Sequence, residues 1–201
     1  MEELHNTKKT VVKRVGQSLD TLLLRNRSYR GYDPSAVVSE ALLRRIVEVN
    51  TKIPSARNQQ VLRFKLITGT DASRVLPLIR MGASLPELHL PFVGTEPPAY
   101  IIVCSSEKET RLVDVDLGIS AQSMLLKAVE LGFNGLIIGA FNKEKLKEEF
   151  ALPIDPLLII AIGKGVEQIR LTEISADESH RYYRREGIHY VPKVQMDDLV
   201  L

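Results

Sequence analysis

The segment from residue 114 to residue 131 constrains the fold of this chain most. Its apolar residues recur at helical spacing and form one stripe: Leu117, Ala121, Leu125, Ala128 and Leu131. Past Asp116, only Lys127 and Glu130 are charged. A helix that is apolar nearly all round is buried on most of its sides. We therefore expect a central helix, or one whose second face is covered by a partner.

Composition describes a self-sufficient domain and says nothing about its chemistry. The chain has 201 residues, of which 44% are hydrophobic and 26% charged, so it can bury a core within one domain. Its net charge of +2 is too small to argue for a nucleic-acid or membrane partner. The single cysteine, Cys104, excludes an internal disulfide, and its apolar surroundings predict a buried structural thiol.

No segment has the pattern of a secretory signal or of a membrane span. The first twenty residues mix charges of both signs, and the longest apolar stretch, residues 156–162, is far shorter than the roughly 20 residues that cross a bilayer. We therefore expect a cytoplasmic protein.

The remaining elements alternate between helices and strands without a regular rhythm. Helices are expected over residues 19–24, 40–50 and 143–150, the last two capped by Ser39 and Asn142. Strands are expected over residues 63–67, 99–104, 135–138 and 156–162. On the first of these strands, Phe64 and Leu66 form the expected core face. The pattern predicts an α+β fold in which helices surround a mixed, mainly antiparallel central sheet.

Two polar clusters in the first third of the chain are candidates for ligand binding. Residues 25–32 hold three arginines and a serine just past a helix, which can bind a phosphate through charge-assisted hydrogen bonds. Residues 54–60 combine a proline, a hydroxyl and side-chain amides, which suit the edge of a flat heterocycle. Taken alone, each cluster is also compatible with an ordinary solvated loop.

Two further candidates follow later in the chain. Residues 135–141 form a strand that runs into Gly139, where backbone amides can approach a ligand closely. Lys193 follows a proline and can reach an anion, although a lysine so near the end of a chain is commonly solvated. The four histidines show no metal-binding spacing, and neither a dinucleotide-binding glycine motif nor a hydrolase nucleophile elbow is present.

The order and separation of these motifs resemble the nitroreductase family of FMN-dependent oxidoreductases. The shared features are Arg-Ser-x-Arg near the start, Pro-Ser-Ala-x-Asn-x-Gln about 25 residues later, a small-residue helix ending in Leu-Gly-Phe, an Ile-Gly-Ala-Phe turn and a late Pro-Lys. The resemblance extends over residues 19–201.

The resemblance implies a set of FMN-binding positions: Arg27, Ser28, Arg30, Ser55, Asn58, Ile138, Gly139 and Lys193. In the family, the first motif contributes to the phosphate and to the N1–C2 carbonyl edge of the ring. The second motif lies against the ring and commonly comes from the other subunit. The backbone of the Ile-Gly turn faces the ring, where the Gly139 amide can bond N5, and the late lysine reaches the phosphate.

The resemblance also implies an intertwined homodimer with FMN at its interface. Residues 1–201 would form one nitroreductase-like domain, with residues 1–16 as an N-terminal extension and residues 171–201 as a C-terminal arm that wraps the partner. The implied reaction is a ping-pong transfer of electrons from NAD(P)H through flavin N5 to a nitroaromatic, quinone or enone.

The chain departs from the family pattern at three places. Asn26 stands where relatives often have arginine, Val61 and Leu62 replace Pro-Trp, and residues 163–165, Gly-Lys-Gly, replace Gly-Tyr-Pro. Three alternatives stay open at this point: a flavin-binding protein without NAD(P)H turnover, a dehalogenase-like or flavin-remodelling enzyme, and a nucleic-acid binder, against which the near-neutral charge argues.

Overall fold

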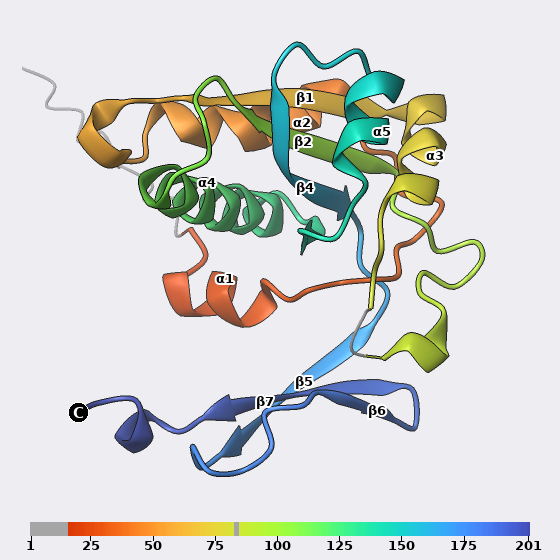
Figure 1. Cartoon of the computed structure of the whole chain (residues 1–201). Coiled ribbons are helices and arrows are strands. Elements are labelled where there is room, and N and C mark those ends of the chain that lie inside the picture. Colours follow the sequence, from red (N-terminus) through yellow and green to blue (C-terminus); the bar gives the residue numbers. More distant parts are fainter. Residues whose placement is uncertain (1–15, 83–84) are drawn as a thin grey trace, which may run out of the picture.

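A four-stranded antiparallel sheet lies at the centre of the computed structural model, which describes residues 16–82 and 85–201 (Figure 1). In spatial order its strands are β1 (Leu62–Thr68), β2 (Ala99–Ser105), β4 (Asp155–Gly163) and β3 (Asn134–Ile138). This arrangement confirms the predicted α+β class. The N-terminal extension expected over residues 1–16 lies outside the described residues except for Gly16.

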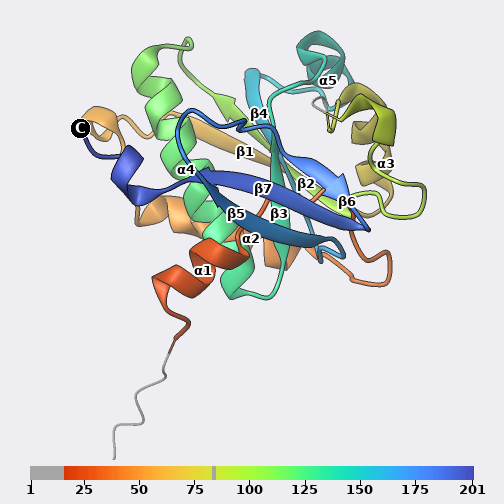
Figure 2. The same ribbon diagram turned by 90° about the horizontal axis from the view of Figure 1, so that it is seen from below.

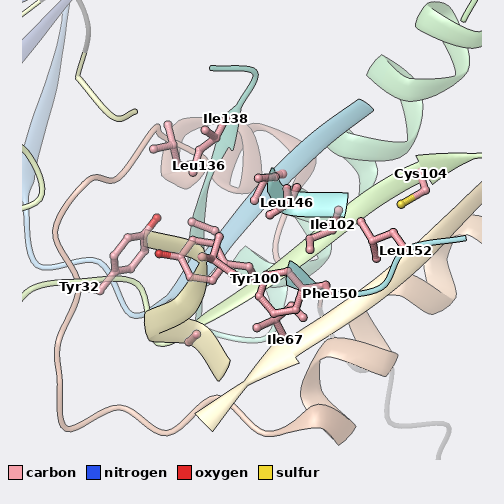
Figure 3. Close-up of a cluster of buried hydrophobic side chains, with 14 residues drawn as sticks. Tyr32, Ile67, Tyr100, Ile102, Cys104, Leu136, Ile138, Leu146, Phe150 and Leu152 are labelled. Carbon is pink, nitrogen blue, oxygen red and sulfur yellow. The ribbon is translucent and has the colours of Figure 1, made fainter. Parts of the chain in front are cut away.

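Helices cover both faces of this sheet. On one face lie α2 (Glu40–Val47) and the long α4 (Arg111–Glu130), and on the other lie α3 (Ala72–Val75) and α5 (Lys143–Glu149). The central strand β2 is buried along its whole length because its alternating side chains enter two different cores. The core beside α3 and α5 includes Tyr100, Ile102, Phe150 and Cys104 (Figure 3).

The predicted helix starts are confirmed by capping hydrogen bonds. The Ser39 hydroxyl accepts from the Leu42 amide, and the Asn142 side chain accepts from the Lys145 amide. Helix α4 begins at Arg111, three residues before the predicted start, because Thr110 caps it. Short 3₁₀ turns complete the connections: η1 (Glu48–Thr51), η2 (Ala56–Asn58), η3 (Gly69–Asp71), η4 (Leu76–Leu78), η5 (Pro86–Leu88) and η6 (Met196–Asp198).

One predicted core face was incomplete. Strand β1 lies at an edge of the sheet, where Phe64 and Leu66 are only half-buried, whereas Ile67 on its opposite face is almost fully buried. The prediction for Cys104 is confirmed, since its thiol is buried and burial raises its pKa to about 11.

Helix α4 is buried on most sides, as predicted, but one stripe of it remains uncovered. Leu112, Val115, Gly118 and Gln122 are exposed along this stripe, and Val115 keeps 49% of its surface. The neighbouring helix α1 (Leu19–Arg25) contributes exposed leucines beside α4. The two helices therefore present one apolar face that the single chain does not cover.

A second, smaller sheet forms from the C-terminal residues (Figures 1 and 2). It consists of β5 (Gln168–Ile174), β7 (Ile188–Val194) and β6 (Tyr183–Arg185), in that order, and β5 and β7 run parallel. The parallel strand pairing expected in the central sheet thus lies in this second sheet, since every strand pair of the central sheet is antiparallel. Among the helices of the described residues, we find none that has the length and apolar character to cross a bilayer.

Candidate functional site

The first arginine motif lies against strand β3. Ser28 pairs with Gly135, and the Tyr29 amide donates to the Gly135 carbonyl over 3.2 Å. Gly135 permits this close packing, since a Cβ atom there would lie 2.5 Å from the Leu125 side chain and 2.6 Å from a backbone oxygen of β4. The structure therefore brings the first motif to the strand that ends at Ile138.

The Gly-Lys-Gly departure at residues 163–165 fits the two tyrosines of this segment. A Cβ at Gly163 would lie 2.5 Å from the Tyr32 ring, and one at Gly165 would lie 2.1 Å from the Tyr29 ring. Tyr32 is completely buried beside Tyr100 in the core of Figure 3, where burial raises the pKa of its hydroxyl. The glycines therefore make room for aromatic anchors that hold the arginine motif in place.

Glu167 fixes the same segment from the other side. Its carboxylate accepts hydrogen bonds from the backbone amides of Arg30 and Gly31, the latter over 3.1 Å, and pairs with Arg184 of β6. The Glu167 side chain keeps only 8% of its surface. Charge-assisted hydrogen bonds of this kind are roughly twice as strong as neutral ones. No local sequence pattern marks Glu167 as a site residue, because only the fold places it beside Arg30.

The guanidinium groups of Arg27 and Arg30 are half-buried and incompletely paired. Arg27 donates to the Leu23 carbonyl over 2.5 Å, and Arg30 donates to the Ser28 carbonyl over 3.0 Å. Within the described residues, the Nε atoms of both arginines are buried without a hydrogen-bond partner. Burial lowers the pKa of Arg27. Buried cationic donors without acceptors suit an anionic ligand that is rich in oxygen atoms, such as a phosphate ester.

The turn after β3 offers open backbone rather than side chains. Ile138 points into the core and keeps 3% of its surface, whereas a Cβ atom added at Gly139 would meet no described atom within 4 Å. The space where a side chain would begin at Gly139 is therefore open, which allows close approach to the backbone from that side. The contact of the Ile138 and Gly139 backbone with a flavin ring stays a prediction.

Ser55 and Asn58 belong to a different part of the chain surface. Their loop is tied to α4 at Asp116, whereas Asn26 beside the first motif contacts α4 at Gln122. Six residues of helix separate these contacts by about 9 Å along the axis and about 120° around it. Within one chain, the second motif therefore does not join the cluster formed by the first motif and β3.

Asp116 holds this second loop in a strained conformation. Its buried carboxylate accepts from the Ala56 amide over 2.7 Å and from the Gln59 side chain over 2.8 Å. Arg57, Asn58 and Gln60 have φ angles of 52°, 54° and 46°, which non-glycine residues seldom adopt. Strain of this kind persists where surrounding contacts determine the backbone. One feature of the sequence indicates Asp116: it is a carboxylate within the helix that is apolar nearly all round.

Lys193 lies on the small sheet, on the same face of β7 as His189, about 13 Å further along the strand. His189 is buried, and desolvation followed by the charges of Arg30 and Arg184 lowers its pKa to about 4. The Lys193 side chain is exposed. The structure therefore places Lys193 on the sheet face that carries a close neighbour of Arg30.

Comparison with known proteins identifies the chain. The model of the Nitroreductase family matches residues 23–164, which contain the first three motifs. The chain belongs to the nitroreductase family. The match ends before β5, so Lys193 and the small sheet lie outside it.

Relatives and a solved structure agree with this assignment. A Bacillus subtilis relative named "Putative NAD(P)H nitroreductase YdgI" is 24% identical, over 79% of this chain and 88% of that protein. A match to "Putative nitroreductase MJ1384" of Methanocaldococcus jannaschii is 28% identical, over 42% of this chain and 46% of that relative. The FMN complex of a nitroreductase-type protein from Exiguobacterium sibiricum 255-15 shares the fold, with a TM-score of 0.61 and 19% identity over 76% of this chain and 90% of that one.

Proposed function

We propose that this nitroreductase-family chain is an FMN-dependent NAD(P)H oxidoreductase. It transfers electrons by a ping-pong scheme from NAD(P)H to an electron-poor acceptor such as a nitroaromatic, a quinone or an enone. The observation that carries the proposal is the pair of buried Nε atoms of Arg27 and Arg30, which have no hydrogen-bond partner within the described residues. They belong to the segment that pairs with β3, the strand that leads to Gly139. The names of YdgI and of the E. sibiricum complex support the donor and the cofactor.

The proposed roles follow from the chemistry of each residue. Arg27, Ser28 and Arg30 hold the phosphate and the N1–C2 carbonyl edge of FMN, and Lys193 adds charge toward the phosphate. The backbone of Ile138 and Gly139 faces the ring, and the Gly139 amide is the donor offered to N5. When bound, FMN supplies the redox chemistry, while the protein orients the ring and sets its electrostatic surroundings.

We further propose that the active form is a homodimer of single nitroreductase-like domains. The uncovered apolar face of α1 and α4 supports this proposal, since obligate dimer interfaces are hydrophobic. Ser55 and Asn58 would then complete the site of the partner, which fits their separation from the first motif within one chain. The C-terminal arm, residues 171–201, would extend over the partner.

The Arg27→Ala variant tests the proposed cofactor site. We expect its dissociation constant for FMN to rise at least tenfold, because a charge-assisted contact to the phosphate is lost. Fluorescence titration of the cofactor-free protein with FMN measures this constant. Arg25→Ala is the matched control, since the Arg25 side chain is exposed and bonds Gln17 instead.

Two outcomes would count against the proposal. An Arg27→Ala protein that binds FMN as tightly as the wild type contradicts the phosphate role. If the wild-type protein binds FMN but neither NADH nor NADPH reduces the bound flavin, the result favours a flavin-binding protein without turnover.

A further inference from the structure

A cluster of polar and aromatic side chains connects Arg30 of the first motif to the small C-terminal sheet. The Arg30 guanidinium lies over the Tyr182 ring, 5.2 Å from its centroid. Glu167 accepts from the Arg30 amide and pairs with Arg184. His189 lies beside the same ring, with 5.0 Å between the two ring centroids. The backbone of Arg30 is therefore held by Glu167, just before β5, and its guanidinium by Tyr182, just before β6.

The two faces of the small sheet have different roles. Arg184 and His189 are register partners, so their side chains share the face that meets Arg30. Tyr183 and Tyr190 are also register partners, and they stack on the opposite face with ring centroids 5.1 Å apart. Adjacent tyrosines thus differ in position: Tyr182 contacts Arg30, and Tyr183 does not share that face.

This contact limits where the Arg30 guanidinium can lie. A long arginine side chain loses conformational entropy when it becomes fixed. When contacts within the protein already hold the side chain in place, ligand binding does not have to supply this entropy, and the affinity for the ligand is higher. The Tyr182 ring attracts the cation and restricts its position, while the guanidinium N–H groups keep their capacity to donate to a ligand. The unpartnered Nε atom of Arg30 agrees with such an arrangement.

We propose that Tyr182 is a positioning residue for FMN, acting through Arg30. This inference rests on the proposed function, because Arg30 belongs to the proposed cofactor site. Glu167 holds the backbone at Arg30, and Tyr182 orients the guanidinium toward the bound cofactor. The C-terminal sheet, which lies beyond the part of the chain matched by the family model, is then a working part of the flavin site.

Fluorescence titration of the full-length, cofactor-free protein with FMN tests the inference. Tyr182→Leu should raise the dissociation constant about fivefold, the effect expected for losing a partly desolvated cation–π contact. Tyr182→Phe should stay within twofold of the wild type, since phenylalanine keeps the ring. Tyr183→Leu, the control on the opposite face, should also stay within twofold. Tyr182→Met serves as a second variant if Tyr182→Leu does not fold.

A double-mutant cycle separates positioning from a general structural effect. In an Arg30→Gln background, Tyr182→Leu should change the FMN dissociation constant by less than twofold, because the group that the ring orients is absent. An equal effect in both backgrounds, or no effect in either, overturns the inference. Failure of the wild type to bind FMN overturns the proposed function, and the inference with it. Wild-type binding with unchanged Tyr182 variants overturns the inference alone.

Discussion

Single buried carboxylates fix the loops of the proposed site by hydrogen bonds, and Asp116 is the clearest case. Two hydrogen bonds join its carboxylate to the loop of residues 54–60, in which three residues adopt left-handed backbone angles. The same two hydrogen bonds pair the buried carboxylate and hold the loop in its strained backbone conformation. The conformation offered by Ser55 and Asn58 therefore depends on a residue of a different element.

Replacing the carboxylate should release this loop. Asp116→Asn places an amide group where two donors converge, so we expect the free energy of unfolding to fall by about 1–3 kcal/mol. Urea denaturation measures the change. Asp114→Asn, an exposed carboxylate on the same helix, is the control and should change little. Equal stability of the two variants would contradict the anchoring role of Asp116.

His189 should make stability depend on pH. Its pKa in the folded protein is about 4, below its ordinary value of 6.5, so the unfolded chain binds the proton more readily. The histidine therefore contributes stability above pH 6.5 that is lost as the pH falls from 6.5 to 4. Denaturant unfolding at a series of pH values measures this slope. His189→Gln should flatten it, whereas replacing the exposed His180 by glutamine should leave it unchanged.

At the scale of elements, local signals predicted the helices and the central strands well. Ser39 and Asn142 cap the helices that follow them because side-chain caps are determined by neighbouring residues. The small sheet was not predicted, because β5 and β7 pair directly although β6 lies between them in the sequence. Glu167 and Asp116 escaped for the same reason, since their partners lie far away in the sequence.

Helix α4 gives the prediction that belongs to this scale. Val115 keeps 49% of its surface on the uncovered apolar stripe, so Val115→Asp should leave the fold intact and convert the proposed dimer to monomers. Light scattering measures the mass, and FMN titration should show weaker binding. Val37→Asp, at an exposed valine outside the stripe, is the control. A Val115→Asp protein that stays dimeric would show that this face is not the interface.

Whether a charged substitution on α4 tests the interface or the core depends on how deeply the replaced residue is buried. Leu125 lies on the same helix but keeps only 5% of its surface, within the core between α4 and the sheet. A charge placed there would disrupt folding and would say nothing about a partner. The sequence pattern places Leu125 on the apolar stripe of the helix. Only the structure shows which side of the helix faces the sheet and which side faces outward.

At the scale of the whole molecule, the two groups of proposed FMN-binding residues lie apart within one chain. One chain brings together the arginine motif, the start of β3 and the residues around the small sheet, while its second motif lies elsewhere along α4. A homodimer that exchanges these motifs would give two complete FMN sites. The near-zero net charge hides this organisation, because a few cations are gathered where the phosphate is proposed to bind.

Anaerobic mixing of the FMN-loaded wild-type protein with NADH or NADPH tests the central claim most directly. The visible absorbance of oxidised flavin reports the reaction, and adding a quinone or a nitroaromatic afterwards reports the second half. We expect that at least one donor bleaches the flavin, that the oxidised nicotinamide leaves, and that the acceptor restores the absorbance. Absorbance that stays unchanged with both donors would contradict this expectation.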